Sequence, residues 1–183
     1  MTQTYQRLST IPEALQRAAS TDRGVTIVDR DLAEQRVLWS DLSTAASRVA
    51  AELRSQGIEP GDRVGILGPT TSQLLVVLFG TWKAGAVPVV LSLPRRISEI
   101  DAFVADVVGR CEKAEAKVLA VSNLLLEQAP PIHTTARVVS LEELASAEGP
   151  PQEASPGDAS DLAYLQFTSG TTARLTRSGN APT

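Results

Sequence analysis

Residues 63–91, RVGILGPTTSQLLVVLFGTWKAGAVPVVL, contain two short apolar runs separated by a longer apolar segment. The two runs, residues 63–67 and 86–91, have the length and the β-branched content expected of buried strands. Between them, a segment that starts after Gly68-Pro69 and continues to about Lys83 is apolar nearly all round, which is typical of a helix buried between layers. Thr70 or Thr71 is expected to cap this helix, and Gly85 is expected to end it. A strand, a helix and a second strand at this spacing predict a parallel βαβ unit.

The same alternation continues towards the C-terminus. Pro94-Arg95-Arg96 leads into a segment with apolar residues at helical spacing, and residues 117–121 and 137–139 follow as further short strands. Residues 148–160 are rich in Pro, Gly, Ser and acidic side chains, which predicts a loop. We therefore expect an α/β fold with a mainly parallel sheet and helices on both faces.

Upstream of the first βαβ unit, the pattern predicts a helix, a hairpin and a second helix. Pro12 suits a first helical turn, and the β-branched runs 25–28 and 35–39 flank a polar segment. Ser40 is expected to cap the second helix, and Gly57 is expected to end it in a left-handed conformation. The apolar face of that helix comprises Leu42, Ala46, Val49 and Leu53.

Composition and charge exclude several classes of protein. The 183 residues carry a formal net charge of −4 with both signs interspersed, so no basic stripe favours a nucleic-acid partner. No run approaches the ~20 apolar residues of a transmembrane segment, and no signal peptide is recognisable, so we expect a cytoplasmic protein. The single cysteine, Cys111, excludes an internal disulfide and is expected to be buried. With His133 as the single histidine, no zinc site can form.

The residues that point to chemistry follow a predicted strand, residues 162–167 (LAYLQF). They are Thr168, Ser169, Gly170, Thr171 and Thr172. Glycine lets the backbone approach a ligand closely, successive N–H groups can form an anion nest, and the hydroxyls add donors that rotate towards phosphate oxygens. The alternative is an ordinary polar turn, since these residue types are common in turns. The GxxxxGK[ST] spacing of NTPase loops is absent.

Two stretches resemble one superfamily, the adenylate-forming enzymes. LAYLQFTSGTT at residues 162–172 resembles its phosphate-binding motif. LWSDLSTAASRVAAELRSQGIEPGDRVGIL at residues 38–67 and LFGTWKAGAVPVVLSL at residues 78–93 resemble its early helix, strand entry and packing segment. The resemblance covers most of residues 10–172, and AYLQFTSGTT with Pro94-Arg95-Arg96 is most similar to the fatty acyl-AMP ligase branch, near the acyl-CoA synthetases.

The resemblance implies an ATP-dependent ligase that joins a fatty acid to AMP, releases pyrophosphate, and transfers the acyl group to an acyl carrier protein, a polyketide synthase or CoA. ATP and Mg²⁺ are implied, with residues 168–172 holding the phosphates. The resemblance assigns no catalytic residue and no metal ligand to this chain. Residues 1–172 correspond to the N-terminal part of the AMP-binding domain, an incomplete N-terminal subdomain that we expect to be inactive alone.

Residues 173–183 depart from the Gly-rich basic continuation of the family, and we expect this tail to be disordered. A frameshift, a truncation and an artificial extension are all compatible with it. A non-catalytic remnant, or a nucleotide- or partner-binding module of the same fold, is the alternative to a ligase. An unrelated α/β nucleotide-binding domain is disfavoured because residues 65–68 lack the GxGxxG spacing. Acyl chain length, the final acceptor and the oligomeric state are left open.

Overall fold

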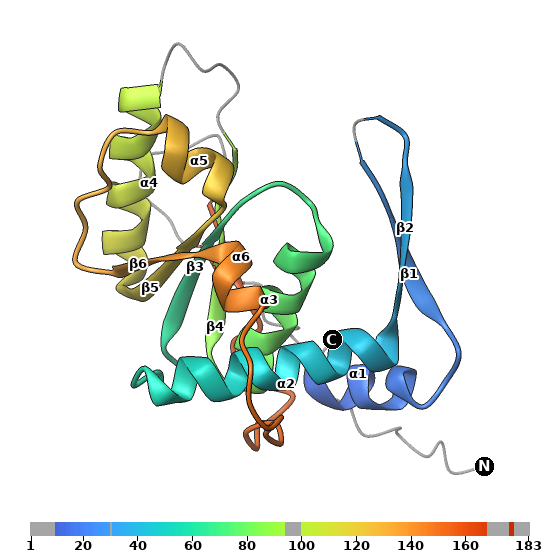
Figure 1. Cartoon of the computed structure of the whole chain (residues 1–183). Coiled ribbons are helices and arrows are strands. Elements are labelled where there is room, and N and C mark those ends of the chain that lie inside the picture. Colours follow the sequence, from blue (N-terminus) through green and yellow to red (C-terminus); the bar gives the residue numbers. More distant parts are fainter. Residues whose placement is uncertain (1–9, 30, 94–99, 168–175, 178–183) are drawn as a thin grey trace.

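A parallel sheet forms the centre of the computed structural model, which describes residues 10–29, 31–93, 100–167 and 176–177 (Figure 1). The described strands of this sheet are arranged in the order β6-β5-β3-β4-β7-β8. All neighbours pair in parallel except β7 and β8, which are antiparallel. The strands are β3 (Arg63–Leu67), β4 (Val87–Val90), β5 (Ala116–Val121), β6 (Arg137–Ser140), β7 (Leu165–Gln166) and β8 (Thr176–Arg177).

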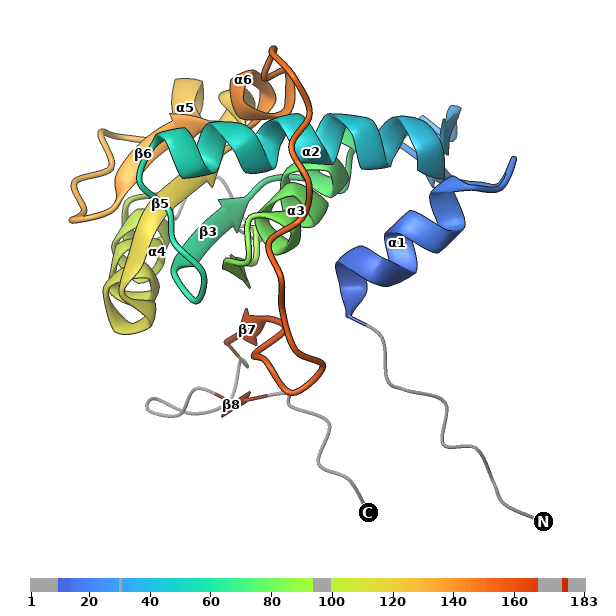
Figure 2. The ribbon, with the colours of Figure 1, turned by 90° about the horizontal axis from the view of Figure 1, so that it is seen from below.

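Helices cover both faces of the sheet, as the sequence predicted (Figures 1 and 2). Side chains alternate along β5, so Val118 and Ala120 join one buried cluster, while Leu119 and Val121 join the other. The first cluster contains residues of α1 (Ile11–Ala19), α2 (Trp39–Ser55), α3 (Ser72–Lys83) and α6 (Leu141–Ala145). The second contains residues of α4 (Ile100–Ala114) and α5 (Asn123–Gln128), including the buried Cys111 that the sequence predicted.

Two glycines allow close packing on either face. A Cβ at Gly80 of α3 would lie 2.5 Å from both Cβ and Cγ1 of Val49 in α2. A Cβ at Gly65 of β3 would lie 2.9 Å from Cδ1 of Leu119 in β5. Since protein interiors are close-packed, a larger residue at Gly80 would force α2 and α3 apart, whereas at Gly65 the Leu119 side chain would have to move.

Several local predictions are confirmed. Thr71 caps α3, its hydroxyl accepting a hydrogen bond from the Leu74 N–H at 3.2 Å. Gly57 and Gly85 have φ angles of +83° and +82°, the left-handed conformation that glycine adopts most readily at the end of a helix. The loop predicted at residues 148–160 contains no regular secondary structure.

Two boundary predictions are wrong. Ser40 does not cap α2, because the helix already begins at Trp39 and Leu38 is the cap residue, with no side-chain hydrogen bond. The Trp39 N–H instead donates to the Arg23 carbonyl at 3.0 Å. The first backbone N–H of the helix is therefore satisfied by the segment before β1, without a polar cap residue. The strand predicted at 162–167 is shortened to Leu165–Gln166, because the Ala163 carbonyl accepts the Trp82 indole N–H at 2.6 Å.

The predicted hairpin forms a separate two-stranded sheet of β1 (Gly24–Val28) and β2 (Glu34–Leu38), which extends away from the parallel sheet (Figure 1). Asp29 Oδ1 accepts the N–H groups of Asp31 and Ala33, each at 2.9 Å, and so stabilises the turn. In the described part of the chain, no helix combines the length and apolar character needed to cross a bilayer.

Candidate functional site

The candidate phosphate-binding segment follows β7, at the edge of the sheet where the parallel strands end. β7 pairs in parallel with β4, in a register that places Val89 opposite Leu165 and Val90 opposite Gln166. The chain therefore leaves β7 on the same side as it leaves β3 and β4. Phe167 is the last described residue before the segment. Thr168, Ser169, Gly170, Thr171 and Thr172 all lie outside the described residues, as do Pro94-Arg95-Arg96 and most of the tail.

The connections after β3 and β4 lead to opposite faces of the sheet. The chain after β3 enters α3 in the first buried cluster, whereas the helix that follows β4, α4, belongs to the second. In open α/β sheets, ligands bind outside the carboxyl ends of the strands at such a switch between faces. β7 lies directly beside β4 and hence next to this switch between faces, and the predicted phosphate-binding residues follow β7 in the sequence.

Contacts from two helices hold the end of β7. Leu165 is buried in the second cluster, and the half-buried Phe167 ring lies under the Arg110 guanidinium, 5.5 Å from its centroid. Arg110 in turn pairs with Asp106 at 2.8 Å. On the other side of the sheet, Trp82 of α3 bonds to the Ala163 carbonyl. The point at which the candidate loop begins is thus fixed by the body of the domain.

A buried lysine, Lys83, lies at the C-terminal end of α3 and was not recognised from the sequence. Lys83 is only 5% exposed, and its Nζ donates to the Ser43 carbonyl at 2.9 Å and to the hydroxyls of Ser43 and Ser47, both at 2.8 Å. Burial lowers the pKa of Lys83 below its ordinary value. A lysine in a segment that is apolar nearly all round was the available signal for this site.

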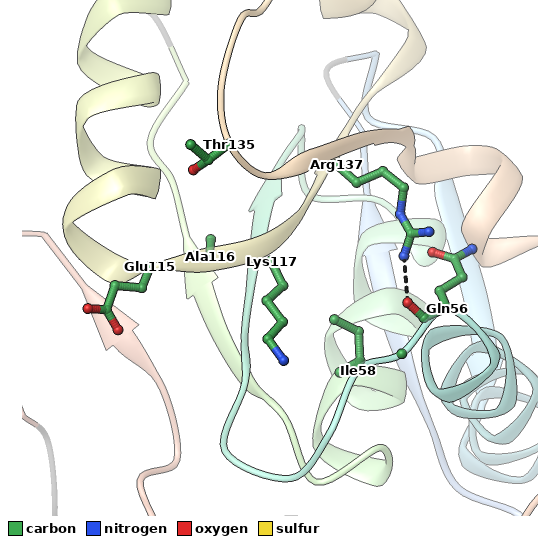
Figure 3. A pocket seen from close by; sticks show the side chains of 8 residues that line it. Gln56, Ile58, Glu115, Ala116, Lys117, Thr135 and Arg137 are labelled. Carbon is green, nitrogen blue, oxygen red and sulfur yellow. Dashed lines mark hydrogen bonds between the residues drawn. The ribbon is translucent and has the colours of Figure 1, made fainter.

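The amino ends of the strands carry other charged groups and two cavities. Burial acts to raise the pKa of Asp62, but hydrogen bonds from Lys117 and from the Glu59 N–H, with the charges of Lys117 and Arg63, lower it overall. A cavity of about 520 Å³ lies beside Lys117, where Arg137 donates to the Gln56 carbonyl at 3.0 Å (Figure 3).

The second cavity, of about 980 Å³, lies between α1, the starts of β3 and β4 and residues 155–163. Both cavities are therefore at the edge of the sheet opposite the carboxyl ends of β3 and β4.

Other candidate residues do not form a reactive site in the described part of the chain. Burial, together with the charge of Glu112, raises the pKa of the Cys111 thiol to about 11. His133 is exposed in a loop. No three His, Cys, Asp or Glu side chains within the described ranges come together as metal ligands. The residues that the structure describes therefore provide no set of ligands that fits Mg²⁺.

A mainly parallel sheet with helices on both faces defines an open α/β domain. The model of the AMP-binding enzyme family matches residues 15–175. The chain belongs to this family of ATP-dependent adenylate-forming ligases.

Known relatives extend this assignment. The chain is 33% identical to a feruloyl-CoA synthase of an Amycolatopsis species over 141 residues, which is 74% of this chain and 26% of the relative. It resembles a structure from work on the fatty acyl-adenylate ligases of E. coli and L. pneumophila, with a TM-score of 0.78 and 24% identity over 89% of this chain and 30% of that one.

It also resembles the adenylation and carrier domains of McyG with phenylalanyl-adenylate, with a TM-score of 0.81 and 21% identity over 93% of this chain and 32% of that one. The two structural matches show the fold, which is that of the N-terminal domain of adenylate-forming enzymes. The chain spans about a quarter to a third of the length of these proteins.

Proposed function

We propose that this chain is the N-terminal part, residues 1–172, of the adenylation domain of an acyl-AMP ligase, with residues 173–183 as a non-matching tail. A fatty acid carboxylate oxygen attacks the α-phosphorus of ATP, the bond from that phosphorus to the bridging oxygen breaks, and pyrophosphate leaves. The acyl-adenylate then passes to an acyl carrier protein, a polyketide synthase or CoA. The reaction takes place in the cytoplasm.

The role proposed for Thr168, Ser169, Gly170, Thr171 and Thr172 is to hold the leaving phosphates. Negative charge builds on these phosphates as pyrophosphate departs, so donors aimed at them stabilise the transition state. The observation that carries the proposal is the position of β7, which is parallel to β4 and followed directly by the TSGTT sequence. Phe167 under Arg110 supports it, because the start of the loop is held in place.

The proposal is tested by measuring the binding of ATP and of tripolyphosphate to the 183-residue chain by calorimetry. The Thr168→Ala/Ser169→Ala/Thr171→Ala variant should bind both ligands at least ~10-fold more weakly, since hydrogen bonds to charged groups contribute ~1.5–3 kcal/mol each. Equal affinity of the variant and the wild-type chain would refute the assignment of the site.

The matched control replaces three hydroxyl residues of other segments, namely β1, α2 and the loop before β6. Thr26, Thr44 and Thr135 are exposed, and their substitution by alanine should leave phosphate affinity unchanged. Equal losses in the control and in the loop variant would show that binding is nonspecific.

Fatty-acid-dependent pyrophosphate release separates a ligase from a binding module of the same fold. We expect no turnover from this chain alone, because the described residues supply no magnesium ligands and well-positioned reactants account for ~7–11 kcal/mol of a barrier. Turnover that the triple loop variant abolishes would overturn this expectation. ATP affinity without turnover, in a longer protein that contains the chain, would favour the binding module.

A further inference from the structure

A long connection without regular secondary structure joins α6 to β7. This connection, residues 146–164, is here called the strap, and it crosses α2 before reaching the sheet (Figure 2). Connections longer than ~12–15 residues without secondary structure are uncommon in compact domains, and those that are ordered usually serve a function. The strap leads into the strand that precedes the candidate phosphate-binding segment.

One arginine of α2 holds the strap against the end of α3. The Arg54 Nη2 donates to the Lys83 carbonyl at 2.6 Å and to the Ser155 hydroxyl at 2.9 Å. Its Nη1 donates to the Gln152 side-chain carbonyl at 3.1 Å. The rigid fork of a guanidinium suits this geometry, because it reaches both the helix end and the strap from one side chain.

The end of α3 is shaped to receive Ser155. The Ser155 N–H donates to the Lys83 carbonyl at 2.8 Å, and its hydroxyl donates to the Ala84 carbonyl at 3.1 Å. The last carbonyls of a helix lack partners within it and carry partial negative charge, so these donors and the Arg54 cation are well matched to them. A Cβ at Gly85 would lie 3.1 Å from Ser155 Cβ, so a larger residue there would crowd the strap.

β7 depends on this attachment because its own pairing is short. The strand comprises Leu165 and Gln166, which pair with two residues of β4 on one side and with two residues of β8 on the other. The strap is fastened at Ser155 and again at Ala163, whose carbonyl accepts the Trp82 indole N–H. The position of β7 along the sheet edge is therefore set by the strap as well as by the β4 pairing.

We propose that Arg54 is a positioning residue for β7, the strand that precedes the phosphate-binding segment in the sequence. By fastening the strap to the end of α3, it determines where β7 meets β4. This inference rests on the proposed function for its consequence, but the link between Arg54 and β7 can be measured without any ligand.

The first test is amide hydrogen exchange in the 183-residue chain. Arg54→Ala should increase exchange at Leu165 and Gln166 by ~10-fold or more, while the amides of β5 stay unchanged. The control is Arg48→Ala, which removes an exposed arginine from the same helix and should alter neither strand. Unchanged exchange at β7, or an equal increase in β5, would overturn the proposal.

A second variant keeps the test decisive if Arg54→Ala does not fold. Ser155→Ala removes the hydroxyl that contacts both Arg54 and the Ala84 carbonyl and leaves α2 intact. Because Gln152 and the Ser155 N–H still hold the strap, the expected acceleration of exchange at Leu165 and Gln166 is smaller, at least ~3-fold. Arg54→Lys should resemble Arg54→Ala more than wild type, because an ammonium cannot reproduce the fork. Wild-type exchange in Ser155→Ala would contradict the proposal.

Calorimetry with tripolyphosphate separates this inference from the proposed function. If the wild-type chain binds and Arg54→Ala binds at least ~3-fold more weakly, Arg54 positions the segment. Unchanged tripolyphosphate affinity in Arg54→Ala, despite faster exchange at β7, would overturn the inference that Arg54 positions the phosphate-binding segment. If the wild-type chain does not bind tripolyphosphate, the proposed function fails, while exchange still decides whether Arg54 positions β7.

Discussion

Substitution of Gly80 by alanine tests the close contact between α2 and α3. The added Cβ would lie 2.5 Å from Cβ and Cγ1 of Val49 and 3.1 Å from the Ala46 carbonyl oxygen. Carbon atoms normally approach to ~3.5–4.0 Å, and Val49 Cβ cannot rotate away because it is attached to the backbone. The two helices must therefore move apart by about 1 Å, which would disturb the packing of the first buried cluster.

The magnitude follows from two opposing effects. Overpacking a buried site costs ~1–3 kcal/mol, and this contact belongs at the upper end of that range because the nearest atoms are rigid. Alanine gains ~1 kcal/mol over glycine in helix propensity. The net expectation is a loss of ~2 kcal/mol in the free energy of unfolding, or a Tm lower by ~4–8 °C for a chain of this size.

Urea denaturation and thermal melting followed by circular dichroism provide the measurement. Gly109 in α4 supplies the matched control, because a Cβ there meets nothing within 4 Å. Gly109→Ala should therefore stabilise the chain by ~0.5–1 kcal/mol through helix propensity alone. If Gly80→Ala were as stable as wild type, the close packing of α2 on α3 would be wrong.

Three further predictions concern buried polar groups. Lys83→Met should raise the free energy of unfolding by ~1 kcal/mol near neutral pH. The pKa of Lys83 in the folded state lies below its ordinary 10.5, so the destabilisation of the wild-type chain by the buried charge is complete below the folded pKa and disappears as pH rises to 10.5. A constant difference in the free energy of unfolding between the two chains, measured by urea titrations from pH 7 to 10.5, would contradict this. Burial raises the pKa of Cys111 from 9.0 to about 11, so iodoacetamide at pH 8 should alkylate the folded chain at least ~100-fold more slowly than the unfolded chain, as followed by mass spectrometry. Ser122→Ala should stabilise the chain by ~1 kcal/mol in urea denaturation, because the buried Ser122 hydroxyl has no hydrogen-bond partner among the described residues; a loss of stability would indicate a partner.

Much of the local structure could be predicted because the relevant signals are contiguous in sequence. The pattern at residues 63–91 contains a strand, a helix and a strand in succession, and the structure has β3, α3 and β4 there. Thr71 and Gly57 act through backbone groups a few residues away, so their roles at helix ends could be recognised without tertiary information.

The remaining features depend on contacts between distant segments. The length of β7 is limited by a bond between Trp82 and Ala163, and no pattern within residues 162–167 indicates it. The burial of Lys83 requires Ser43 and Ser47 to face it from another helix. The order β6-β5-β3-β4-β7 depends on the direction in which each crossover turns, which periodicity does not specify.

The attachment of the strap has a consequence for how the chain folds. Arg54 and Ser155 are separated by 101 positions, and the carbonyl that both contact belongs to Lys83, at the end of a helix packed on α2. Contacts between positions so far apart carry a large entropic cost of loop closure and form after local ones. The strap attaches to Arg54 of α2 and to the end of α3, and these two groups come together only once the helices have packed. The strand β7, which follows the strap, should therefore join the sheet last. A chain emerging from the ribosome would then have a formed core before the strand that leads to the candidate loop is in place.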